Sequence, residues 1–156
     1  MPRYAAKTQV SSEKSKAEIE RTLTRYGATE FLYGTKTEWA VVAFKMAGRQ
    51  IRFMLPLPDR RNAEFTEYKR GYSTWERTNE AANKLYEQAI RQKWRALALI
   101  IKAKLEAVES GITEFEDEFL AHIVLPNGQT MGEFAKPQIE HAYSTGEMPP
   151  LLGHDG

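Results

Sequence analysis

The stretch EWAVVAFKMAGRQIRFMLPLP, residues 38–58, decides the fold. Its first half, EWAVVAFKM, is rich in β-branched and aromatic residues, which favour a strand. Its second half, RQIRFMLPL, alternates apolar and more polar positions, so that one face carries Ile51, Phe53 and Leu55. Ala47-Gly48 is short enough for a hairpin turn, and Pro56 ends the second strand because proline has no N–H to donate. The stretch therefore predicts two antiparallel strands.

Outward toward the amino terminus, the sequence predicts a third strand and a helix. TEFLYGT at 29–35 is strand-like, and the turn at 35–37 joins it to the next strand. Before it, apolar residues at helical spacing predict a helix from about Ser15 to Tyr26, with Gly27 as its C-terminal glycine. Ser12 or Ser15 can cap this helix, and Ser15 has the capping-box spacing to Glu18.

After the two predicted strands, the sequence predicts helices. The chain from Ser73 to about Ser110 contains no glycine or proline, which predicts one long helix. A helix restarts at Thr113 with Glu116 at capping-box spacing, and PNG at 126–128 indicates a turn. A last helix opens at a third capping box, Thr130 with Glu133, and Pro137 is expected to force a late start or a kink.

Together these elements predict an α+β fold of order α-β-β-β-α, in which a three-stranded antiparallel meander packs on a long helix and further short helices follow. We expect residues 1–143 to form a single domain, with 1–11 flexible, and 144–156 to be an extended or disordered tail.

Composition narrows the function classes. The 156 residues are 42% hydrophobic and 28% charged, which is typical of one soluble domain. There is no cysteine, so disulfides, thiolate metal sites and cysteine nucleophiles are excluded. The sequence has no signal-like apolar segment and no run of about 18 apolar residues. We expect a cytoplasmic protein with no membrane contact.

Charge is distributed unevenly along the chain. Residues 1–104 carry 21 Lys and Arg against 11 Asp and Glu, whereas residues 105–156 carry one Lys against 10 acids. The first segment has a net charge of +10 and the second of −9. This asymmetry predicts a basic surface for a polyanion and an acidic end that shields it or recruits a partner. The alternative is that the two segments interleave their charges on one surface.

Cations alternate with aromatic residues in PDRRNAEFTEYKRGYSTWER, residues 58–77. Such a mixture suits a nucleic acid, because bases stack on aromatic rings and phosphates attract cations. The aromatic residues, however, are spaced 3, 4 and 3 apart, which is typical of an amphipathic segment that buries one face. We therefore expect at least two of the aromatic rings to point inward and the cations to point outward. The aromatic residues are Phe65, Tyr68, Tyr72 and Trp75.

The predicted long helix carries a second group of cations. At about 100° per residue they fall in one narrow stripe, which either binds phosphates or is solvated surface. The stripe consists of Arg77, Lys84, Arg91, Arg95 and Lys102.

No catalytic motif occurs in the sequence. Glu118 and His122 are spaced to reach one metal ion, but nothing specifies the further ligands that a site needs, so solvated acidic surface is favoured. There is no phosphate-binding glycine loop and no GxSxG motif. We expect a protein that is not an enzyme, with no catalytic residues, metal or cofactor.

Several segments carry a family resemblance. They are KSKAEIERTLTRYGATEFLYG, GRQIRFMLPLPDR, RQKWRALALIIKAKLEAVESGITEFEDEFLAHIVLPNG and EMPPLL. In these segments, and over nearly the whole chain, the sequence resembles a family of small uncharacterised proteins encoded by tailed bacteriophages and prophages. The resemblance implies a bacterial cytoplasmic setting and an accessory role in DNA metabolism or in countering host defence.

Two functional hypotheses follow. The leading one is a non-enzymatic accessory protein that binds nucleic acid, with DNA, including single-stranded DNA, favoured over RNA. Its predicted contact residues are Arg49, Arg52, Arg60, Arg61, Lys69, Arg70, Arg91 and Arg95. The alternative is a protein that inhibits a host enzyme or defence system by binding it through the acidic carboxy-terminal third. A homo-oligomer is compatible with either.

Overall fold

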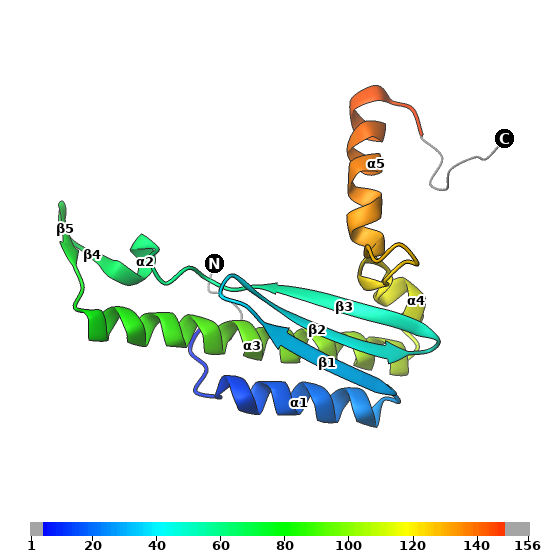
Figure 1. Cartoon of the computed structure of the whole chain (residues 1–156), viewed down its shortest axis with the longest axis horizontal. Coiled ribbons are helices and arrows are strands. Elements are labelled where there is room, and N and C mark those ends of the chain that lie inside the picture. Colours follow the sequence, from blue (N-terminus) through cyan, green and yellow to red (C-terminus); the bar gives the residue numbers. More distant parts are fainter. Residues whose placement is uncertain (1–4, 149–156) are drawn as a thin grey trace.

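The computed structural model describes residues 5–148, whose arrangement is shown in Figure 1. Its main elements are the helices α1 (Ser12–Arg25), α3 (Asn79–Glu109) and α5 (Met131–Thr145) and the strands β1 (Glu30–Thr35), β2 (Trp39–Met46) and β3 (Arg49–Pro56). The smaller ones are α2 (Ala63–Thr66), β4 (Glu67–Arg70), β5 (Ser73–Glu76), α4 (Phe115–Glu118) and the 3-10 helix η1 (Leu120–His122). The predicted α+β fold is confirmed: a helix, a three-stranded antiparallel sheet, a long helix and shorter helices.

The sheet has the order β1-β2-β3, and both connections are hairpins. In the β2–β3 hairpin Met46 faces Arg49, so Ala47 and Gly48 form a two-residue loop. Their φ angles are +51° and +72°, and positive φ at both loop residues is the type I′ geometry that matches strand twist. Ala47 therefore occupies a left-handed conformation in which an L side chain is strained.

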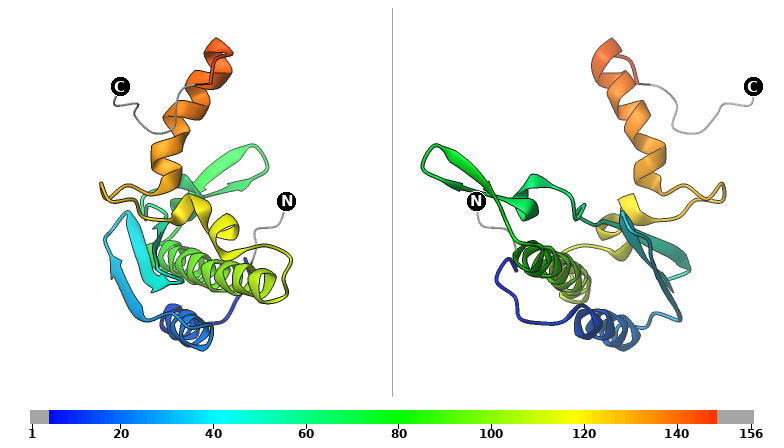
Figure 2. Two further views of the ribbon diagram at one scale, coloured as in Figure 1. Left: turned by 90° about the vertical axis from the view of Figure 1, so that its right-hand side faces the viewer. Right: turned by 60° about the vertical axis from the view of Figure 1, so that its left-hand side comes forward.

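One face of the sheet holds the core. Residues of β2 and β3 alternate, and their buried members lie against α1 and α3, which cover the same face (Figure 2). The core consists of Ile19 and Leu23 from α1, Ala40, Val42 and Phe44 from β2, Ile51, Phe53 and Leu55 from β3, Trp94, Leu97, Ala98, Ile101 and Leu105 from α3, and Phe119 and Ile123. Because α1 and α3 must both reach this face, the sheet and the two helices form one packed unit.

The ends of α1 are set by local chemistry. Gly27 has φ +100°, and its N–H donates to the Thr24 carbonyl while that of Ala28 donates to the Leu23 carbonyl, at 3.1 and 2.9 Å. These are the two bonds of a Schellman motif, which confirms the predicted C-terminal glycine. The predicted N-terminus was wrong, because Ser11 caps the helix and Ser15 lies inside it, buried and with its hydroxyl unpartnered among the described residues.

The long helix starts later than the sequence predicts. Residues 73–76 form strand β5, and α3 begins only at Asn79, where the Thr78 hydroxyl accepts from the Ala81 N–H at 3.2 Å. All the buried side chains of α3 lie between Gln92 and Leu105. Its amino-terminal turns therefore extend past the core, and there they carry α2 and the β4–β5 hairpin (Figure 1).

The carboxy-terminal part attaches to the edge of β3. Phe119 is fully buried against Phe44 and Phe53, and Ile123 forms a bridge with Ile51. The Thr130–Glu133 capping box is confirmed, and α5 then runs from Met131 to Thr145 with Pro137 inside it, so no late start occurs. The expected cap at Thr113 was wrong, since α4 follows Glu114 without a side-chain cap.

The predicted limits of the domain and its ends are only partly within the described residues. Helix α5 continues two residues past the expected boundary at 143 and ends at Gly146 in a left-handed conformation. Near the other end, the Gln88 side chain donates to the carbonyls of Ala6 and Thr8 at 3.2 and 2.8 Å, which ties this segment to α3. The predictions for residues 1–4 and 149–156 lie outside the described residues.

Candidate nucleic-acid interface

Strands β4 and β5 form a two-stranded antiparallel ribbon separate from the main sheet. Arg70 pairs with Ser73, so Gly71 and Tyr72 make a two-residue loop, and Gly71 has φ +64°. A glycine at the first loop position is what a type II′ hairpin requires, since only glycine adopts that conformation without strain. All eight strand residues are exposed. In both views of Figure 2 the ribbon stands out from the body of the molecule.

The base of the ribbon is held by Arg77 and Phe65. The Arg77 guanidinium donates to the carbonyls of Glu64 and Phe65 at 2.8 and 3.3 Å, and its backbone N–H donates to the Thr66 carbonyl at 2.7 Å. The Phe65 ring is buried and meets the Tyr86 ring of α3 edge to face, with centroids 5.8 Å apart. These contacts fix the orientation of the ribbon on α3, although its strands do not pair with the described strands of the main sheet.

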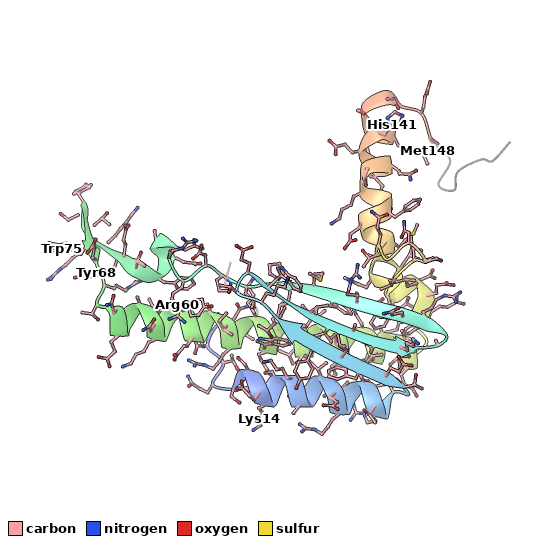
Figure 3. The ribbon with its side chains drawn as sticks, in the orientation of Figure 1. Lys14, Arg60, Tyr68, Trp75, His141 and Met148 are labelled. Carbon is pink, nitrogen blue, oxygen red and sulfur yellow. The ribbon has the colours of Figure 1, made fainter. Side chains whose placement is uncertain are left out.

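One face of the ribbon combines rings with a cation. Tyr68 and Trp75 are directly opposite in register, and Arg70 follows Tyr68 by two residues, so all three share a face. Tyr68 is 41% exposed, Trp75 is 54% exposed, and Tyr72 at the tip is fully exposed. Figure 3 shows Tyr68 and Trp75 at the end of the molecule. The expectation that at least two of the four rings in this segment point inward was wrong, because only Phe65 is buried.

Two adjoining hollows lie next to α3, between it and the turn that joins β1 to β2. Their volumes are about 500 and 630 Å³, and both are lined by Lys36, Leu57 and Tyr86. The cations that line one or both hollows are Lys16, Lys36, Arg60, Arg61 and Arg91, and the acids are Glu13, Glu38, Asp59 and Glu87. The hollows are therefore mixed in charge, in contrast to the tip of the ribbon.

The cations that line the hollows differ in how far their charge is already neutralised by neighbouring groups. Arg61 pairs with Asp59 at 3.0 Å, and its guanidinium lowers the pKa of the Asp59 carboxyl. Arg60 lies over the Tyr86 ring, 4.3 Å from its centroid, and donates to Asn83. Arg91 donates to the Gln88 side chain at 2.6 and 3.1 Å. Arg60 and Arg91 thus have neutral partners and keep their charge available to an anion.

Of the eight predicted contact residues, five lie around this end of the molecule. Arg60, Arg61 and Arg91 line the hollows, and Lys69 and Arg70 are on the ribbon. Lys69 and Arg70 have no ion-pair or hydrogen-bond partner for their side chains among residues 5–148. They are the predicted cations whose charge is least compensated.

The other three predicted residues are neutralised within the protein. Arg95 pairs with Glu18 of α1, and Arg49 pairs with Glu116 at 3.2 Å. Arg52 donates to the Gly128 carbonyl at 2.9 Å and lies 3.5 Å from Glu133. Their acidic partners are far away in the sequence, so the sequence alone does not reveal these pairs. The eight cations do not form one surface, because Arg49 and Arg52 lie at the opposite end of the sheet.

The predicted cationic stripe on the long helix is also divided. Arg77 precedes the helix and binds carbonyls, Arg95 pairs with Glu18, and Lys84 pairs with Glu80 at 3.7 Å. A continuous phosphate-binding ridge along α3 is therefore not what the structure offers.

The sequence named Tyr68 and Trp75 as candidate stacking rings but did not place them opposite each other on a ribbon, and it gave no indication of the hollow cations Lys16 and Lys36. A usable signal for the ribbon was present: EYKR and STWE flank Gly71-Tyr72, and a glycine between two short runs indicates a hairpin. The helical spacing of the aromatic residues obscured it.

Glu118 and His122 do not form a joint site. The Glu118 carboxylate binds the Lys104 ammonium at 3.2 Å, and the His122 ring stacks on Phe53 with centroids 4.0 Å apart. Within residues 5–148 no group of three or more His, Asp or Glu side chains is arranged to hold a metal ion. The same residues contain no helix that is long and apolar enough to span a bilayer.

Comparison with known proteins adds no family to this description: no protein-family model, curated protein or solved structure matches the chain.

Proposed function

We propose that this protein is a non-enzymatic accessory protein that binds DNA, with the β4–β5 ribbon as the principal contact. The observation that carries the proposal is the ribbon itself: Tyr68, Tyr72 and Trp75 are exposed, Arg70 shares a face with Tyr68 and Trp75, and neither Arg70 nor Lys69 has a side-chain partner among residues 5–148. Within the chain Tyr68 and Trp75 pair across the two strands and Arg77 lies over the Tyr68 ring, but the exposed parts of the rings still offer stacking platforms for bases.

Single-stranded DNA fits the ribbon better than a duplex. A two-stranded ribbon is narrow enough for the major groove, but duplex readers depend on many phosphate contacts. This ribbon carries three exposed rings and two cations without a partner in the described part of the chain, a ratio that favours stacking on unpaired bases. Arg60, Arg91 and Lys36 in the hollows add further cations along α3, next to the acids that line the same hollows.

The resemblance to small phage-encoded proteins supports a role in a bacterium that carries a phage genome. In that setting the protein acts in the cytoplasm of an infected or lysogenic bacterial cell. A role on single-stranded DNA agrees with an accessory part in phage DNA metabolism.

The test is a fluorescence-anisotropy titration of an oligonucleotide of about 16 nucleotides, single-stranded and as a duplex, at about 50 and about 200 mM salt. We expect tighter binding to the single strand. With three or four phosphate contacts, the slope of log K against log salt is expected to be about −2 to −3. No salt dependence, or no binding at low salt, contradicts the proposal.

The double variant Lys69→Glu/Arg70→Glu separates the ribbon from general charge. It is expected to lower affinity roughly tenfold or more and to make the salt slope shallower by about 1.4, since two phosphate contacts are lost. The matched control is Arg21→Glu/Lys102→Glu, which changes the net charge equally at two exposed cations of α1 and α3 away from the ribbon. If both variants lose the same affinity, the ribbon is not the contact.

A second candidate function uses the acidic end to bind a host protein. Glu109, Glu114, Asp117, Glu140 and Glu147 are exposed there and have no ion-pair partner among the described residues. However, Glu116, Glu118 and Glu133 neutralise Arg49, Lys104 and Arg52 of the same chain, which removes a third of the nine acidic charges between residues 105 and 148. If a purified bacterial enzyme is inhibited at one-to-one stoichiometry without nucleic acid, this candidate replaces the first.

A further inference from the structure

One face of the β4–β5 ribbon carries aromatic rings and cations. Tyr68 is directly opposite Trp75 in register, and Arg70 lies two residues further along β4, so these side chains share one face, which we call the ring face. The Arg77 guanidinium lies over the Tyr68 ring, 6.0 Å from its centroid. The ring face therefore has a cation on each side of the ring pair, and Tyr72 follows at the tip of the ribbon.

The opposite face of the ribbon, the acidic face, has the reverse charge. Glu67 and Glu76 are directly opposite each other in register, both are exposed, and neither has an ion-pair partner among residues 5–148. The other strand residues of this face are Lys69 and Thr74, so one cation is outnumbered by two acids. Because like charges repel, a phosphate backbone is excluded from the acidic face and attracted to the ring face.

The ring face has room for a few nucleotides. Each strand of the ribbon has four residues, which span about 13 Å. Nucleotides that keep a spacing of about 3.4 Å along one strand cover this length with about four units. The three exposed rings of the ribbon offer platforms for about three bases. Both estimates give a site of about three or four nucleotides.

Carboxylates separate the ring face from the cations that line the hollows. Glu76 ends β5, and Glu80, which lies 3.7 Å from Lys84, follows in the first turn of α3. Asn83, which accepts from the Arg60 guanidinium, lies about one turn further along the helix. A strand that leaves the ribbon toward the hollows therefore passes acids before it reaches Arg60, so the hollows do not lengthen the contact.

We propose that the ribbon binds a short unpaired segment of about three or four nucleotides, which lies along the ring face alone. This inference rests on the proposed DNA-binding function and names the substrate class of that site. An unpaired segment of a few nucleotides, such as a gap in a duplex, is sufficient, and a longer single strand adds no contacts. Because the ribbon stands out from the body of the molecule, its tip can enter such a gap (Figure 2).

The first experiment measures how many unpaired bases the site takes. Labelled 16-mers contain a central window of about 1 to about 16 thymidines, and abasic nucleotides fill the remaining positions, so that the number of phosphates is constant. In anisotropy titrations at about 50 mM salt, we expect the affinity to rise steeply up to a window of about three or four thymidines. A wider window should add only the statistical gain from more binding positions, about 14-fold at most.

The outcomes separate this inference from the proposed function. If the 16-mer with thymidine at every position does not bind, DNA binding itself is contradicted. If it binds but the affinity rises beyond the statistical gain, the contact continues past the ribbon and this inference alone is overturned. A duplex with a gap of about four thymidines should bind at least tenfold more tightly than the same duplex without the gap. A gapped duplex that binds no better than the intact one also overturns the inference.

The second experiment tests which face of the ribbon holds the strand. Ser73 lies on the ring face opposite Arg70, and Thr74 lies on the acidic face. Ser73→Glu and Thr74→Glu therefore place the same charge at neighbouring positions on opposite faces. Ser73→Glu should weaken binding of the 16-mer at least tenfold, whereas Thr74→Glu should weaken it by no more than about threefold. Hydrogen exchange of the β4 and β5 amides checks that both variants keep the ribbon. Equal losses of affinity overturn the binding to one face.

Discussion

The chain contains two antiparallel hairpins with two-residue loops, and they differ in what surrounds them. In β2–β3 every second residue is buried in the core, whereas in β4–β5 every strand residue is exposed. An isolated two-stranded hairpin is marginal in water, so the β4–β5 ribbon depends on its anchors, Phe65 and Arg77. The same local structure is therefore scaffold where its side chains pack and a candidate contact surface where they do not.

The largest difference between the hairpins should appear on removing a ring from the packed one. Phe44 is 2% exposed and meets Phe119 edge to face, so Phe44→Ala leaves a cavity and should cost about 3–5 kcal/mol of unfolding free energy. Tyr72→Ala at the ribbon tip should change it by less than about 0.5 kcal/mol. Urea unfolding measures both, and equal losses would remove the contrast.

For DNA binding, the larger effect is expected in the β4–β5 hairpin. Trp75→Ala removes an exposed stacking ring and should weaken single-strand binding by about 1–3 kcal/mol. The unfolding free energy should fall by no more than about 1 kcal/mol, the size of one cross-strand pair. Trp75→Phe, which keeps a ring, should retain most of the affinity in the same anisotropy assay. Full affinity in Trp75→Ala would contradict the role of the ribbon.

The dependence of the ribbon on its base can be measured by hydrogen exchange. Arg77→Ala removes the guanidinium bonds to the carbonyls of Glu64 and Phe65, which should destabilise the ribbon locally by about 1–2 kcal/mol. Amides of β4 and β5 should then exchange roughly 5–30 times faster, while those of β2 and β3 keep their protection. Arg70→Ala, which removes a cation from the same ribbon without an anchor, is the control. Acceleration in both hairpins would show that they unfold as one unit.

The loop of the packed hairpin is strained, unlike that of the ribbon. Ala47 has φ +51°, a conformation that asparagine tolerates better, so Ala47→Asn should raise the unfolding free energy by about 0.5–1 kcal/mol. In the ribbon loop, glycine already occupies the position with positive φ. Gly71→Ala should therefore loosen the ribbon without changing the global unfolding free energy. The urea midpoint reports the first change. A lower midpoint for Ala47→Asn would contradict the strain.

The smallest expected effect is a pH dependence of global stability caused by His122, whose ring stacks on Phe53 of the packed hairpin. Burial on Phe53, and next the charge of Lys104, lower the pKa of His122, although a hydrogen bond with the Arg52 backbone opposes them. The unfolded chain therefore binds this proton at higher pH than the folded one, so stability should fall as pH drops below about 6.5. His122→Gln should reduce the fall in urea midpoint between about pH 8 and about pH 5.5. If the fall stays the same, other groups cause the pH dependence.

Much of the fold could be predicted because its signals are local. Strand alternation at 49–57, the glycine after α1 and the Thr130–Glu133 capping box all act within a few residues, and the structure has all three. Strand β5 was harder to predict, because the glycine that indicates a hairpin competes with the spacing of Tyr72 and Trp75, which also fits a helix. The choice was made by the pairing of Tyr68 with Trp75 and by the anchoring of Arg77, neither of which the local pattern contains.

The sequence by itself determined the α+β class, the order of the first elements and the uneven distribution of charge. Only the tertiary structure decided which cations are available: Arg49, Arg52 and Arg95 meet acids 67 to 81 residues away, whereas Lys69 and Arg70 meet none among the described residues. The physical reason is range. Backbone preferences act over a few residues, but charges are neutralised by whichever groups the fold brings within about 4 Å, and sequence distance does not limit those contacts.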